Sequence, residues 1–172
     1  NMKSTLVVVL TLILFPISGV AQASLDFLED ITGVETVVIT KDAFELLSKF
    51  NPEKFKDSKE IKVFQMATGL EEFKIFSSKD PVIAKKIASM SQEALKKQNL
   101  IRLKGTKEKD AFVEVYTKAT KNKAFASAIV LFVKEIDPDT KDANEARIIV
   151  LKGNLQIQQI PKLAAIFLLK NG

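Results

Sequence analysis

Three residue types are missing from this chain of 172 residues: it contains no cysteine, no histidine and no tryptophan. Without cysteine there are no disulfides and no thiolate ligands for zinc or iron–sulfur clusters. Without histidine there is no Ser-His-Asp or Cys-His catalytic pair, and no imidazole to bind a metal or a haem. The sequence therefore excludes the commonest nucleophilic and metal-dependent enzymes, and it predicts no cofactor.

The first 23 residues have the three parts of a secretory signal peptide. Lys3 supplies the positive charge, residues 6–15 form an apolar run, and an Ala-Gln-Ala site ends at Ala23. A retained membrane anchor is the alternative, but it needs about 20 continuous apolar residues, and this run is interrupted at Pro16. We therefore expect cleavage after Ala23 and export to the periplasm or cell envelope.

Residues 24–172 are enough for a single domain, and their apolar periodicity predicts an α+β fold. With 47% hydrophobic and 27% charged residues, the chain has the composition of a folded protein. We expect a largely antiparallel sheet of five or six strands with helices packed on one face. The helices are expected at residues 24–31, 43–50, 57–69, 80–98 and 158–169, and the strands at residues 34–40, 72–77, 100–104, 112–118, 126–134 and 147–153. The segment at residues 57–69 also fits the alternation of a strand.

Local signals support several of these elements. Thr40 and Asp80 are expected to cap the helices that follow them, the second directly before Pro81. Residues 128–133 have no polar side chain on either face, which predicts a central strand covered on both sides. Polar turns between the last four strands favour an antiparallel meander. Residues 166–169 are a candidate exposed apolar patch.

The chain carries a net charge of +5, which favours contact with acidic surfaces such as phospholipid head groups. The residues that we single out for such contact are Lys85, Lys86, Lys96 and Lys97, all in the helix expected at residues 80–98. Nucleic-acid binding is not expected, because basic residues are not interleaved with exposed aromatic ones. Twelve phenylalanines against one tyrosine are typical of a core rather than an interface.

Calcium binding is the first chemistry that the acidic residues suggest. Residues 137–142 begin like an EF-hand loop, with two aspartates two positions apart. Lys141, Asp142 and Ile148 stand where such a loop needs an oxygen ligand, a glycine and a glutamate. We therefore predict a polar hairpin loop here and no metal site.

Paired carboxylates are the second candidate, since acid–base catalysis can use two of them. Glu71 and Glu72 are neighbours on an expected strand, so their side chains point to opposite faces. Asp110 and Glu114 lie near the start of another strand and are expected to face solvent. The sequence also has no serine followed three positions later by lysine, so a serine–lysine hydrolase is not indicated. We predict that the chain is not an enzyme.

Three segments carry a resemblance to a known family. They are residues 33–41, residues 126–132, and residues 150–155 with Ile157 and Ile160. Together they resemble the domain of unknown function 4252 family, exported proteins of Gram-negative Bacteroidetes. The resemblance implies no assigned activity and no catalytic residues, and the family's gene neighbourhoods imply a link to extracytoplasmic sigma-factor systems. Many members are lipoproteins, which a chain without cysteine does not match.

These observations lead to a hypothesis about function. We expect a non-enzymatic envelope protein that binds an envelope partner or a lipid, with a link to the envelope-stress response. The alternatives are a module that binds a lipid or membrane surface and, third, a hydrolase of unknown type. The oligomeric state is left open by the sequence pattern.

Overall fold

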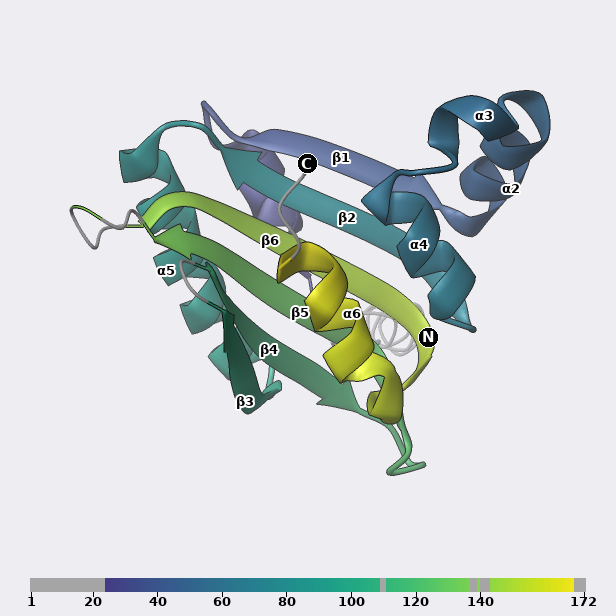
Figure 1. Ribbon diagram of the computed structural model, residues 1–172. Helices are drawn as coiled ribbons and strands as arrows, with labels where there is room; N and C mark the ends of the chain where they lie inside the picture. The colour runs from purple at the N-terminus through teal and green to yellow at the C-terminus, as the bar shows by residue number, and fades with distance from the viewer. Residues whose placement is uncertain (1–23, 109–110, 137–138, 140–142, 169–172) are drawn as a thin grey trace, which may run out of the picture.

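The computed structural model describes residues 24–108, 111–136, 139 and 143–168 (Figure 1). The signal peptide predicted at residues 1–23 lies outside the described residues, as do Asp110 and most of the loop at residues 137–142. In chain order the elements are the 3-10 helix η2 (Asp26–Asp30), β1 (Glu35–Thr40), α2 (Lys41–Phe50), α3 (Pro52–Phe55), α4 (Lys59–Met66), β2 (Leu70–Ser78), α5 (Pro81–Lys97), β3 (Ile101–Glu108), β4 (Ala111–Ala119), β5 (Phe125–Ile136), β6 (Ala143–Gln156), the 3-10 helix η3 (Ile157–Gln159) and α6 (Ile160–Leu168).

The six strands form one antiparallel sheet in the order β1-β2-β6-β5-β4-β3. The predicted meander is confirmed, because β3, β4, β5 and β6 pair in sequence order. Strand β2 then pairs with the open side of β6, and β1 forms the outer edge. The strand without a polar face is β5, which is one of the two middle strands of the sheet, and its residues 128–133 are buried. These features confirm an α+β domain with a largely antiparallel sheet.

Helices cover both faces of this sheet, so the expectation of helices on one face was wrong. Helices α4 and α6 lie against one face and α5 against the other (Figure 1). The physical reason lies in the central strands: Ile129 and Leu131 of β5 enter the core under α4 and α6, while Val130 and Phe132 enter the core under α5. An apolar residue at every position of a strand requires cover on both sides.

Capping residues set where the helices begin. Asp80 Oδ1 accepts a hydrogen bond from Val82 N–H at 2.9 Å, with Pro81 in the first turn of α5, as the sequence predicted. The segment at residues 57–69 contains helix α4 rather than a strand. Within the described ranges, no helix is both long and apolar enough to cross a bilayer.

The two ends of the described chain differ from expectation. The predicted first helix is a short 3-10 helix, η2, which buries Leu28. In the apolar run predicted to be exposed at residues 166–169, Ile166, Phe167 and Leu168 are instead buried in the core that α6 shares with the sheet, and position 169 lies outside the described residues. The sequence alone does not show which strands such a run covers, so the run can be mistaken for an exposed patch.

Candidate functional site

Helix α2 is strongly amphipathic, yet none of its residues is buried. It begins directly after β1, where Thr40 Oγ1 accepts a hydrogen bond from a first-turn amide at 3.2 Å. Phe44, Leu47, Phe50 and Leu46 follow one another at spacings that place them side by side on a helix. Phe50 is 80% exposed and Leu46 is 57% exposed. The apolar face of α2 is therefore largely open to solvent rather than packed in a core.

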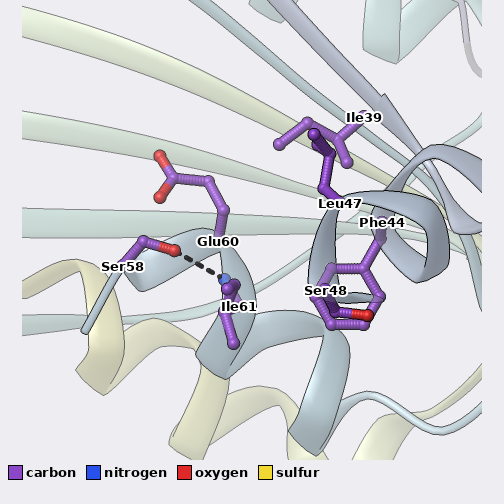
Figure 2. A pocket seen from close by; sticks show the side chains of 7 residues that line it. All are labelled: Ile39, Phe44, Leu47, Ser48, Ser58, Glu60 and Ile61. Carbon is purple, nitrogen blue, oxygen red and sulfur yellow. Dashed lines mark hydrogen bonds between the residues drawn. The ribbon is translucent and has the colours of Figure 1, made fainter. Parts of the chain in front are cut away.

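Helix α4 lies next to α2 and is held more firmly. Ser58 Oγ accepts a hydrogen bond from Ile61 N–H at 3.2 Å at its start (Figure 2). Ile61 and Val63 are both buried, and Val63 belongs to the core under α6. One wall of the gap between the two helices is thus fixed to the body of the domain.

An apolar groove of about 260 Å³ lies between β1, α2 and α4. Figure 2 shows the side chains of β1 and α2 on one side of it and those of α4 on the other. The lining residues are Ile39, Phe44, Leu47, Ser48, Ser58, Glu60 and Ile61. The groove and the exposed face of α2 form one continuous apolar surface, because Leu47 belongs to both.

A series of four phenylalanine rings connects this groove to the core. Phe44 stacks on Phe64 with ring centroids 4.6 Å apart and planes within 7°. Phe64 contacts Phe73, and Phe73 contacts Phe167 of α6, each pair with centroids 6.3 Å apart. Offset or tilted aromatic pairs of this kind are worth about 0.5–1.5 kcal/mol each beyond their buried area. The stack positions α2 even though none of the residues of this helix is fully buried.

The polar groups that line the groove are two hydroxyls, both held by local hydrogen bonds, and one carboxylate. Ser48 Oγ donates to the carbonyl oxygen of Glu45 at 2.9 Å, and the Ser58 hydroxyl caps α4. Glu60 adds a carboxylate at the rim. Next to it in sequence, burial and then repulsion from Arg147 lower the pKa of the Lys59 amine. Lys59 is not one of the lining residues, so Glu60 is the single charged group among the described residues that line the groove.

The four lysines singled out from the sequence lie elsewhere, on the solvent side of α5. Lys85, Lys86, Lys96 and Lys97 are all exposed, and the two pairs are about three helical turns apart on the same side of the helix. Glu93 lies on that side as well and pairs with Lys97 at 3.4 Å between Nζ and Oε1. The structure brings the lysines together on one face, but that face also holds an acidic residue.

Two ion clusters were not predicted from the sequence, and the first ties η2 to β2. Lys74 Nζ lies 2.7 Å from Asp26 Oδ1 and 3.0 Å from Glu29 Oε1. The hydrogen bond from Lys74 lowers the pKa of Asp26, even though burial opposes it. Burial alone would lower the pKa of Lys74, but the hydrogen bonds and charges of Asp26 and Glu29 together raise it. This cluster fastens the start of the described chain to the sheet.

The second cluster surrounds Glu114, which was expected to face solvent. It is only 8% exposed, and it accepts a hydrogen bond from Gln92 Nε2 at 3.0 Å. Arg102 and Lys134 lie 3.4 and 3.5 Å from its carboxylate. The prediction was wrong because these partners come from α5, β3 and β5, which only the fold brings together. Burial, and then the charge of Glu114, raise the pKa of the neighbouring Tyr116.

The family comparison covers most of the chain and includes both walls of the groove. Residues 27–163 match the family described as Domain of unknown function (DUF4252). The chain belongs to the DUF4252 family. No curated protein and no solved structure matches it.

The groove of this DUF4252 domain is made of segments from the family match, with Ile39 coming from the first of the three segments that carry the resemblance. The sequence predicted a helix at residues 43–50, but it gave no signal that the apolar face of this helix would remain open to solvent. The carboxylates Glu71 and Glu72 are not brought to the groove. In the described part of the DUF4252 chain, no group of three acidic side chains is close enough to hold a metal ion.

Proposed function

We propose that this DUF4252 protein is an exported, non-enzymatic binding protein of the cell envelope that holds an apolar segment of a partner protein. The binding surface is the groove between β1, α2 and α4 together with the exposed side of α2. The observation that carries the proposal is the amphipathic helix α2, which exposes Leu46 and Phe50 beside an apolar groove. Contiguous exposed apolar surface is typical of interaction sites.

A protein segment suits this surface better than a free small molecule. The groove holds about 260 Å³, which is below the range of about 300–1,000 Å³ for pockets that enclose a drug-sized ligand. The apolar surface continues outside the groove onto Phe50, where a small molecule would remain in water. An apolar helix or strand from a partner covers both parts at once, as in helix-in-groove recognition.

The charges near the groove also favour a protein over an acidic membrane. Helix α2 carries Lys41, Asp42, Glu45 and Lys49, so its charges balance. Interfacial helices that bind acidic lipid carry an excess of basic residues on the polar side. The lining hydroxyls of Ser48 and Ser58 are used in local hydrogen bonds. The chain has no histidine or cysteine to activate them, so binding without catalysis fits the chemistry of the lining.

Lipid binding through α5 is the second candidate, since the structure does gather its four lysines on one side. Glu93 offsets one of the four charges through its ion pair with Lys97. A lysine near an acidic membrane surface contributes about 1 kcal/mol, so three charges give a dissociation constant on the order of 10 mM. Val82, 76% exposed, is the only large apolar side chain among the exposed residues of α5. This face alone is too weak to hold the protein on a membrane.

Site-specific photocrosslinking in cells tests the proposal. A crosslinking phenylalanine analogue replaces Phe50, and in a control variant it replaces Ile101, which is 55% exposed on β3. We expect one discrete protein adduct from position 50 that position 101 does not give. An adduct to lipid alone, or the same proteins from both positions, contradicts the proposal.

Measuring the dissociation constant of the purified partner then shows how much Phe50 contributes to binding. Phe50→Asp is expected to weaken binding by at least about 30-fold, because a central apolar contact at a protein interface is worth about 2 kcal/mol or more. Ile101→Asp is the matched control and should bind as the wild type does. Equal binding by both variants would place the interface elsewhere. The identity of the partner would also test the link to the envelope-stress response.

A further inference from the structure

The two edges of the sheet are built differently. Strand β3 forms one edge, and its pairing with β4 shifts register between Leu103 and Thr106. It also exposes Arg102 and Lys107. Bulges and basic side chains are the devices by which proteins stop an edge strand from pairing with another chain. The β3 edge is therefore protected.

Strand β1 forms the other edge and has none of these devices. All six of its residues pair with β2 without a register shift, and no proline or charge lies between Glu35 and Lys41. Val37 and Val38 point to opposite faces and are each 47% exposed. Figure 1 shows β1 at the upper margin of the sheet, with β2 on its inner side. The backbone groups on the outer side of β1 are therefore regularly spaced and can pair with a further strand.

The sequence of this edge is complementary to itself. When residues 35–41 are placed antiparallel to a second copy about Val38, valine faces valine at the centre. Val37 faces Ile39, and Thr36 faces Thr40, on either side of that centre. At both ends Glu35 lies opposite Lys41, the first residue of α2, which directly follows the extended backbone of Thr40 (φ −88°, ψ 161°). Branched apolar pairs, threonine pairs and opposite charges are the cross-strand combinations that stabilise antiparallel strands.

We propose that β1 pairs with β1 of a second copy of this chain, about a two-fold axis through Val38. The axis is perpendicular to the sheet, so residues that share a face within one copy share a face across the pair. The result is a continuous sheet with the helices of both copies on matching sides. This inference does not depend on the proposed partner protein.

Other two-fold registers give less favourable cross-strand pairs, so the sequence favours the register about Val38. A two-fold axis through Val37 places Glu35 opposite Ile39, and an axis through Ile39 places Lys41 opposite Val37. Each of these registers puts a charged side chain opposite an apolar one. In the described part of the chain neither Glu35 nor Lys41 forms an ion pair. Both side chains are exposed and available to a second copy.

Charge reversal tests the pairing, with the full chain purified from cells and studied by sedimentation velocity over a concentration series. The wild type is expected to dimerise reversibly. Glu35→Lys places two lysines opposite each other at both ends of the ladder, and Lys41→Glu does the same with two glutamates. Each single variant should raise the dimer dissociation constant by about tenfold or more.

A mixture of the two single variants provides the decisive test of the pairing. Equal amounts of the Glu35→Lys and Lys41→Glu variants restore both opposite-charge pairs, so the mixture should form a heterodimer. The double variant should dimerise like the wild type. Amide hydrogen exchange should show protection of β1 in the wild type that is lost in each single variant, with β3 unchanged. A wild type that stays monomeric, or dimers that are indifferent to the single reversals, would overturn the proposal.

Discussion

The carbonyl oxygen of Gly69 occupies the space in which a Cβ on Gly153 would lie, at the point where β2 and β6 begin to pair. The crowding is mutual, because a Cβ on Gly69 would meet the carbonyl oxygen of Asn154. The Asn154 amide also donates a hydrogen bond to Gly69 at 3.1 Å. Two backbones thus approach as closely as glycine allows, and Gly153 lies in one of the segments that carry the family resemblance.

Replacing Gly69 by alanine should destabilise the domain more than the same change at Gly33. The two glycines have nearly the same backbone angle, φ +89° and +90°, so the penalty of about 1–2 kcal/mol for a left-handed alanine is common to both. A Cβ at Gly33 would meet only the end of the Ile83 side chain, which can move. We expect Gly69→Ala to cost more than about 3 kcal/mol in urea unfolding. Equal losses would mean that the two backbones can separate.

Removing the Asp26 carboxylate should make the free energy of unfolding less dependent on pH in the acid range. The pKa of Asp26 is below 3.8 in the folded protein, so its ionised form stabilises the fold above that pH. This contribution is lost as the pH falls from 3.8 through the lower folded value. Asp26→Asn should therefore unfold more easily than the wild type at neutral pH, and the difference should shrink in acid.

Asp30→Asn is the matched control for that titration. Asp30 lies in the same 3-10 helix, and in the described part of the chain it forms no ion pair. Chemical unfolding across the acid range should give the same pH profile for Asp30→Asn and the wild type. A pH-independent difference between Asp26→Asn and the wild type would show that the ion pair with Lys74 contributes nothing.

Two threonines of β1 should respond in opposite directions to the same change. The Thr36 hydroxyl is buried without a hydrogen-bond partner in the described structure, whereas the Thr40 hydroxyl caps α2. Thr36→Val should stabilise the domain by about 1 kcal/mol, because an unsatisfied buried hydroxyl is removed. Thr40→Val should destabilise it by about 1 kcal/mol through loss of the cap. Thermal unfolding at equal protein concentration distinguishes the two, and a loss of stability in both would contradict the assignment of Thr36.

Features that depend on neighbouring residues could be predicted from the sequence. The Thr40 and Asp80 caps were correct because a cap acts within three residues of the helix that it begins. The central position of residues 128–133 was correct because a strand without a polar face has to be buried. The same argument, followed further, required helices on both faces, and that step was missed.

Features that join distant segments could not be predicted in this way. Glu114 looked like a surface charge because its partners Gln92, Arg102 and Lys134 lie on three other elements. The groove needs β1, α2 and α4 together, and periodicity shows only that α2 has an apolar face. Periodicity does not show whether a core covers that face. The self-complementary edge was readable in residues 35–41, but only the strand order makes it an edge.

The charge of Glu114 should be visible in the titration of Tyr116. This chain has one tyrosine and no tryptophan, so the ultraviolet change of alkaline titration reports Tyr116 alone. Its ring packs edge-on against Phe132 with centroids 5.5 Å apart. Burial is the larger cause of its raised pKa and the Glu114 charge is the next. Glu114→Gln should therefore lower the pKa of Tyr116 but leave it above 10.0, because the burial remains.

A surface charge provides the control, since Glu93→Gln on α5 removes an exposed carboxylate that pairs only with Lys97 among the described residues. Its titration curve should match that of the wild type. Glutamine at position 114 can keep the contact with Gln92, so the fold should survive and the shift reports charge rather than unfolding. An unchanged pKa in Glu114→Gln would mean that Arg102 and Lys134 already neutralise the carboxylate. In that case burial alone would account for the raised pKa.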